Sequence, residues 1–159
     1  MGNIGYALKP IGSRDVKEIY AMLEAGFGYS GKMDFAFFSN NKERIFIAVR
    51  DVCRINFEGL RVNSVGIYFA EMHKGAIRLS IEGSQIIGKE CSKNVLDVDR
   101  RQALEWMTGQ DISISNPGKG YVIIRHEGDY LGCGKYADGK ILNHVPKERR
   151  LRVSISALP

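Results

Sequence analysis

The sequence predicts an α+β protein, with a small α/β domain at the N-terminus and a mostly β domain with one helix after it. Three observations predict this class. An amphipathic helical pattern comes before several short strand patterns in the first half of the 159 residues. Aromatic and β-branched runs separated by glycine turns fill most of the second half. A polar, glycine-led stretch at 88–94 lies between them, so we expect domains at 1–90 and 91–159.

The N-terminal domain is expected to begin with a helix that Ser13 caps and that runs to about Ala25. Gly26 is a natural stop for it. Its apolar face has the spacing i, i+3, i+4, i+7 and consists of Val16, Ile19, Tyr20 and Leu23.

Strands are expected to follow this helix. Residues 33–39 and 44–49 form two of them, with a turn between and a short helical piece at about 52–57. Residues 62–87 are predicted as two further strands joined at 73–75, where Gly75 suits the positive φ of a tight turn.

The second domain is expected to open with a strand at 94–98 and a helix that Asp97 or Asp99 caps. That helix should run to about Thr108 and bury Ala103, Leu104 and Met107, while Trp106 packs at the domain junction. Residues 118–136 predict a hairpin that turns at 127–129, and 139–146 and 149–158 predict more strand.

Glycines in this domain are predicted to shape strands rather than to hold phosphate. Gly132 and Gly134 suit a strand that another backbone approaches closely, and Gly139 suits a hairpin turn. A phosphate loop would need a glycine at Asp129 and Ser or Thr at Tyr136, and a dinucleotide-binding motif would need one at Ala137.

Charge favours a polyanion partner. The net charge is +5, and from Pro117 onward eight Lys or Arg residues stand against four acids. A local basic excess is typical of nucleic-acid binding, and an uneven but merely solvated surface is the alternative. The first ten residues lack a signal-peptide pattern, and no apolar run is long enough for a membrane span.

The sequence predicts no metal site, cofactor or catalytic residue. Its three cysteines and three histidines are scattered without metal-ligand spacing, which favours buried thiols in a reducing compartment. No nucleophile-elbow, zinc-protease or serine-triad motif is present.

Nine residues are candidates for RNA contact, either as phosphate-binding cations or as hydrogen-bonding partners of bases and 2′-hydroxyls. They are Arg100, Arg101, Lys135, Lys140, Asn143, His144, Lys147, Arg149 and Arg150. Two cations in a first helical turn oppose the helix dipole, which hints at a bound anion. Simple neutralisation by Asp97 and Asp99, and a solvated basic rim at 135–150, are the alternatives.

Residues 61–152 resemble the RNA-binding PUA-like domain that ends RsmF-type RNA 5-methylcytosine methyltransferases. The resemblance rests on the helix region 94–112 and on two motifs, "LG-x-GK" and "G-x-(I/L)-x-N-H-x-P-K-x-x-R". Here the motif residues are Leu131, Gly132, Gly134, Lys135, Gly139, Asn143, His144, Pro146, Lys147 and Arg150. The family's S-adenosylmethionine loop and Pro-Cys dipeptide are absent, so the resemblance implies the RNA-binding appendage without the catalytic domain.

The two-domain plan also resembles the Nip-seven family of ribosome-biogenesis factors, through 9–20 and 65–87. Together the resemblances imply a non-catalytic protein that binds structured rRNA or tRNA during RNA modification or ribosome assembly in an archaeal cytoplasm, away from membranes. The partners implied are RNA and an RNA methyltransferase or pre-ribosomal protein. An adaptor that delivers RNA to a separate methyltransferase, and an enzyme with an unrecognised site, are the alternatives.

Overall fold

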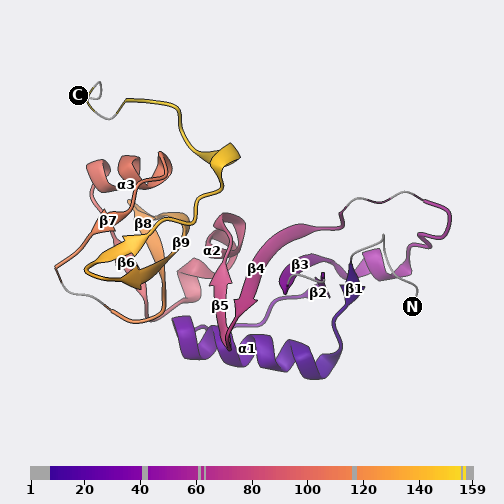
Figure 1. The fold of residues 1–159 in the computed structure, drawn as a ribbon. Helices are drawn as coiled ribbons and strands as arrows, with labels where there is room; N and C mark the ends of the chain where they lie inside the picture. Colours follow the sequence, from indigo (N-terminus) through magenta and orange to yellow (C-terminus); the bar gives the residue numbers. More distant parts are fainter. Residues whose placement is uncertain are drawn as a thin grey trace.

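Two five-stranded sheets make up the fold of the computed structural model, which describes residues 8–40, 43–60, 62, 64–115, 118–154 and 156. The first sheet is antiparallel, with the order β1-β2-β3-β4-β5. Its strands are β1 (Lys9–Pro10), β2 (Phe35–Ser39), β3 (Arg44–Val49), β4 (Ile67–His73) and β5 (Ala76–Leu79). Helix α1 (Ser13–Phe27) runs along this sheet (Figure 1).

The second sheet is mixed and has the order β6-β8-β9-β10-β7. Its strands are β6 (Val95–Asp97), β7 (Ile112–Ser113), β8 (Tyr121–His126), β9 (Asp129–Ala137) and β10 (Lys140–Leu142). Strand β6 is parallel to β8, and the other pairs are antiparallel. Helix α3 (Arg100–Met107) follows β6, as predicted, so the α+β class and the single long helix of this half are confirmed.

Three short segments connect these elements. Helix α2 (Ile81–Ile87) leads into the 3-10 helix η2 (Gly88–Glu90), and it lies between the two sheets in Figure 1. The other 3-10 helices are η1 (Arg50–Arg54) and η3 (Lys147–Arg149). Among the described residues no helix has the length and apolar character that crossing a membrane requires.

The ends of α1 differ from the prediction. Gly12, not Ser13, occupies the N-cap position and makes no side-chain hydrogen bond there. Gly26 lies inside the helix, and the helix ends at Gly28, whose φ of 64° is left-handed. Glycine favours this conformation because it has no Cβ, so the second of two nearby glycines is the stop.

Two predicted strands are wrong. Residues 81–87 form helix α2, which Ser80 caps by accepting a hydrogen bond from the Gly83 amide at 2.9 Å. Residues 150–154 are not in a strand, and much of 155–159 lies outside the described residues, as do residues 1–7. The helix at 81–87 forms because its buried face packs on β4 and β9, contacts that local propensity does not report.

The predicted hairpins and glycine roles are confirmed. Strands β8 and β9 pair around a turn at Glu127 and Gly128. Gly139 has a φ of 74° in the turn before β10. Gly134 lies against Leu142 and Trp106 so closely that an added Cβ would be 2.8 Å from the Leu142 carbonyl oxygen.

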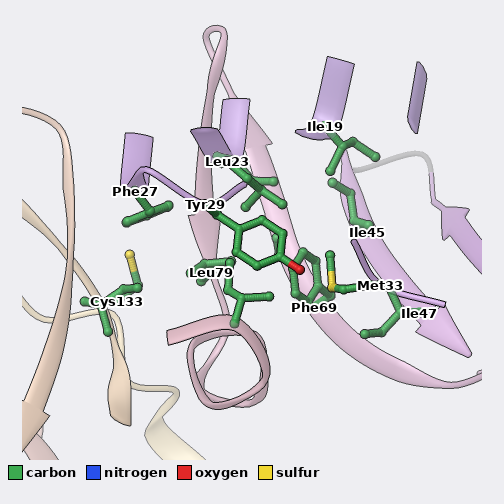
Figure 2. Close-up of a cluster of buried hydrophobic side chains, with 14 of the residues drawn as sticks. Ile19, Leu23, Phe27, Tyr29, Met33, Ile45, Ile47, Phe69, Leu79 and Cys133 are labelled. Atoms are coloured by element: carbon green, nitrogen blue, oxygen red, sulfur yellow. The ribbon is translucent and has the colours of Figure 1, made fainter. Parts of the chain in front are cut away.

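The largest hydrophobic cluster crosses from one half of the chain to the other. It combines α1 and the first sheet with Ile123, Tyr130 and Cys133 of the second sheet. Figure 2 shows Cys133 beside Phe27 at one side of this cluster. The strands of the two sheets fall on either side of residue 90, and the boundary at 90/91 stays a proposal because this shared core spans it.

Candidate nucleic-acid interface

An open groove of about 600 Å³ lies where the two sheets meet. One wall comes from the first sheet and the start of α2, with Arg44, Tyr68 and Arg78 among its residues. The other wall comes from α3, β9 and the segment from His144 to Arg149. The groove therefore contains part of the basic run that the sequence singles out, together with residues from the other half of the chain.

Three charged side chains form a ladder across the first sheet. The register places Glu71 of β4 opposite Arg44 of β3 on one side and opposite Arg78 of β5 on the other. The Oε2 atom of Glu71 lies 3.5 Å from Arg44 Nε and accepts a hydrogen bond from Arg78 Nη2 at 3.1 Å. Opposite charges on directly paired residues stabilise a sheet and hold the two guanidinium groups in place.

Tyr68 completes this ladder. Its hydroxyl donates to Glu71 Oε2 at 3.2 Å, and the Arg44 guanidinium carbon lies 5.4 Å from the centre of its ring. Burial, followed by the nearby Glu71 carboxylate, raises the pKa of the Tyr68 hydroxyl. Tyr68 is therefore a neutral, partly buried ring with an arginine close by.

His144 joins the two halves of the chain. Arg78 Nη1 lies 2.8 Å from His144 Nδ1, and because a guanidinium only donates, the neutral ring carries its proton on Nε2. That Nε2 atom is buried with no hydrogen-bond partner among the described residues. Burial, then Arg78 and Lys135, lower the pKa of His144, so it is neutral at pH 7.

Lys135 and Lys147 are exposed cations near this junction. Lys135 Nζ lies 5.9 Å from the ring centre of Tyr121, and the Tyr121 ring in turn lies 6.4 Å from that of His144. Lys147 stands between Pro146 and Glu148, which both line the groove. Within the described part of the chain neither lysine has an ion pair, so both are available to a phosphate.

The other predicted cations have partners. Arg149 pairs with Glu82 at 2.6 Å, Lys140 with Asp111 at 2.9 Å, and Arg101 with Glu105 at 3.2 Å. The last is an i, i+4 pair on the exposed face of α3, and a surface pair of this kind is weak enough for an anion to replace it. Asp99 caps α3 in a capping box with Gln102, which satisfies the helix start without a bound anion.

Asn143 and Arg150 serve the fold. The Asn143 amide donates to the carbonyl oxygens of Trp106 and Gln110 at 2.8 and 2.9 Å, and its Oδ1 accepts from the Val145 amide at 2.8 Å. Its backbone N–H, followed by Lys140, lowers the pKa of Asp111. Arg150 is half-buried and donates to the Val145 carbonyl oxygen at 3.0 Å.

The structure thus brings three of the nine predicted residues to the groove region, Lys135, His144 and Arg149, with Lys147 at its edge. Arg100 and Arg101 do not line the groove. Trp106, predicted at the junction, is fully buried; its Nε1 donates to the Leu131 carbonyl oxygen at 2.8 Å, and its ring reaches the groove wall.

Sequence reasoning missed the first-sheet residues Arg44, Tyr68 and Arg78. The turn at 73–75 was one available signal, because a two-residue turn there sets Glu71 opposite Arg78. No group of three or more His, Cys, Asp or Glu residues in the described ranges could hold a metal ion. Burial raises the pKa of the Cys91 thiol to about 11 and that of Cys133 to about 12, so neither is a reactive thiolate at neutral pH.

Comparison with known proteins places the second half of the chain. Residues 93–151 match the family model described as the methyltransferase RsmF PUA domain. A ribosomal RNA small subunit methyltransferase F from Vibrio vulnificus is 38% identical over 89 residues, which are 56% of this chain and 19% of that protein. The enzyme of the same name from Aeromonas salmonicida is 28% identical over 151 residues, 92% of this chain and 30% of that protein.

The chain therefore spans less than a third of the length of these relatives. Its fold also resembles the crystal structure of a hypothetical protein from Pyrococcus horikoshii OT3. That match has a TM-score of 0.55 at 16% identity and covers 86% of this chain and 93% of that one.

Proposed function

We propose, from the PUA-like domain that residues 93–151 share with RsmF-type methyltransferases, that this chain binds structured rRNA or tRNA without catalysing a reaction on it. The family match is the observation that carries the proposal. The exposed lysines Lys135 and Lys147, beside a groove with arginines on both walls, give it a physical basis. Such cations bind RNA by neutralising phosphates and releasing counterions.

A double variant tests RNA binding. Lys135→Ala with Lys147→Ala removes two exposed charges that have no described ion pair, and Lys17→Ala with Lys32→Ala removes two exposed charges from the first half. Fluorescence anisotropy with a labelled structured RNA should show weaker binding for the first double variant and nearly unchanged binding for the second. Equal loss in both would mean that only net charge matters, and no binding by the natural chain would overturn the proposal.

The non-catalytic part of the proposal rests on the sequence. The three cysteines follow Val52, Glu90 and Gly132, so none stands in the Pro-Cys dipeptide of the resembled family, and no S-adenosylmethionine loop is present. Calorimetry should therefore detect no S-adenosylmethionine binding to these 159 residues, and a tritium-transfer assay no RNA methylation. Micromolar binding of S-adenosylmethionine would contradict this part.

A second candidate function is an adaptor that delivers RNA to a separate methyltransferase in an archaeal or bacterial cytoplasm. Two observations favour it: both halves of the chain align with a methyltransferase, and the first half exposes Val49, Ile55 and Leu60 by more than half. Tagged chain purified from its own cells would then carry an RNA methyltransferase. Replacing Ile55 and Leu60 with Ser should release that enzyme and leave RNA affinity unchanged.

A further inference from the structure

The groove between the sheets has walls that suit a nucleobase better than a phosphate alone. Arginines and glutamates alternate along it, so it offers both hydrogen-bond donors and acceptors, as the edge of a base does. Tyr68, Ile81 and Trp106 add aromatic and apolar surface. Its volume of about 600 Å³ is in the range of small-ligand sites, which admits a base and its sugar and excludes a duplex.

The two arginines of the ladder keep hydrogen-bonding capacity for a ligand. A guanidinium has five N–H donors, and Arg78 uses one on His144 and one on Glu71. Arg44 directs its Nε towards Glu71, and its side chain is 48% exposed. Because Glu71 fixes both side chains, they are already in position before a ligand arrives.

We propose that this groove binds one unpaired nucleotide of the RNA, with Arg44 and Arg78 as its specificity-determining contacts. The inference rests on the proposed RNA binding and adds that the first sheet takes part. Proteins that recognise RNA commonly take an unstacked base between aromatic rings and guanidinium planes. The second wall carries His144 and Arg149, within the residues that match the PUA domain, so a strand that contacts Lys135 and Lys147 lies close enough to enter the groove.

The test compares two labelled RNA hairpins that differ only in one bulged nucleotide. The natural chain should bind the bulged hairpin about tenfold more tightly, the order expected for one captured base. Arg44→Gln and Arg78→Gln should each remove most of this preference while affinity for the fully paired hairpin stays within about threefold.

Arg50→Gln is the matched control, because Arg50 lies just after the same sheet, pairs with Asp34 and does not line the groove. It should keep the full preference. Thermal unfolding checks each variant. If Arg78→Gln, whose side chain is only 25% exposed, fails to fold, the half-exposed Arg44→Gln decides.

The outcomes separate the two proposals. Binding of both hairpins with equal affinity, or a preference that survives in Arg44→Gln and Arg78→Gln, overturns the groove assignment and leaves RNA binding intact. Failure to bind either hairpin overturns both. A 4-thiouridine at the bulge should cross-link to β4 or to residues 144–149, and cross-links confined to other segments also overturn the assignment.

Discussion

At the scale of single residues, Gly134 shows how closely the second sheet packs. A Cβ at this position would lie 2.6 Å from Trp106 Cη2 and 2.8 Å from the Leu142 carbonyl oxygen, and it would also clash with Ile141. Two of these neighbours are fully buried, and the third is a backbone atom, so none can move away easily. The glycine is therefore a packing requirement and not a phosphate loop.

We predict that Gly134→Ala lowers the free energy of unfolding by about 1–3 kcal/mol, the usual cost of overpacking. The matched control is Gly26→Ala, because Gly26 lies inside α1 and a Cβ there meets nothing within 4 Å. That change should stabilise the chain by up to about 1 kcal/mol. Thermal unfolding of the two variants should move in opposite directions, and a Gly134→Ala variant as stable as the natural chain would contradict the packing account.

His144 predicts a pH dependence of stability. Burial, Arg78 and Lys135 lower its pKa in the folded chain below the usual 6.5, so the unfolded chain binds its proton first as the pH falls. Stability should therefore be complete above about pH 6.5 and decline as the pH falls from there through the lower folded pKa. Protonation would also place a positive ring against Arg78.

The measurement is the melting temperature between pH 8 and pH 5 for the natural chain and for His144→Gln, which still offers Arg78 an acceptor. We expect the variant to lose less stability on acidification than the natural chain. His73→Gln, at an exposed histidine, should keep the natural pH profile. Parallel profiles for the natural chain and His144→Gln would show that His144 does not control this range.

At the scale of elements, helix α2 is the main difference between expectation and structure. Its sequence, IEGSQII, has three isoleucines and a glycine, which favour a strand locally. It is helical because Ser80 caps it and because one side packs on β4 and β9, where Gly83 meets the Phe69 backbone and Gly88 meets the Tyr130 ring. Those contacts come from distant segments, so the local pattern could not reveal them.

Removing the cap tests this explanation. Ser80 Oγ accepts from the Gly83 amide at 2.9 Å and donates to the Tyr68 carbonyl oxygen at 2.6 Å. Ser80→Ala should cost about 1 kcal/mol of stability, as cap removal usually does. Ser13→Ala, at the residue that sequence reasoning took for a cap, should change stability by less than about 0.5 kcal/mol because Ser13 makes no cap bond. Denaturant unfolding distinguishes the two, and equal losses would contradict the assignment of the caps.

Elements with a strong local pattern were predictable. The β8–β9 hairpin follows from an apolar run and a glycine turn, and α3 follows from Asp99 with Gln102 three residues later. The ends of α1 were not, because two glycines compete to end it and only the backbone conformation decides. Residues 150–154 alternate like a strand but find no partner strand.

At the scale of the whole molecule, the groove depends on contacts between residues far apart in the chain. Arg78 and His144 are 66 positions apart, and Arg149 and Glu82 are 67 apart. The sequence pointed to the basic run at 135–150 but not to the first-sheet residues that face it, because no local period relates the two. The plan resembling the Nip-seven family, with its role for the first domain, stays a prediction.

The central claim is that this chain binds RNA through phosphate contacts in its second half. The measurement that tests it most directly is the salt dependence of affinity for a structured RNA. With about four contacts, matching the local excess of eight basic over four acidic residues, a plot of log K against log salt should have a slope near −3. That slope corresponds to roughly a hundredfold loss between about 50 and 200 mM salt. Lys135→Ala with Lys147→Ala should make the slope shallower by about two contacts. A flat response, or an unchanged slope in that variant, would contradict the account.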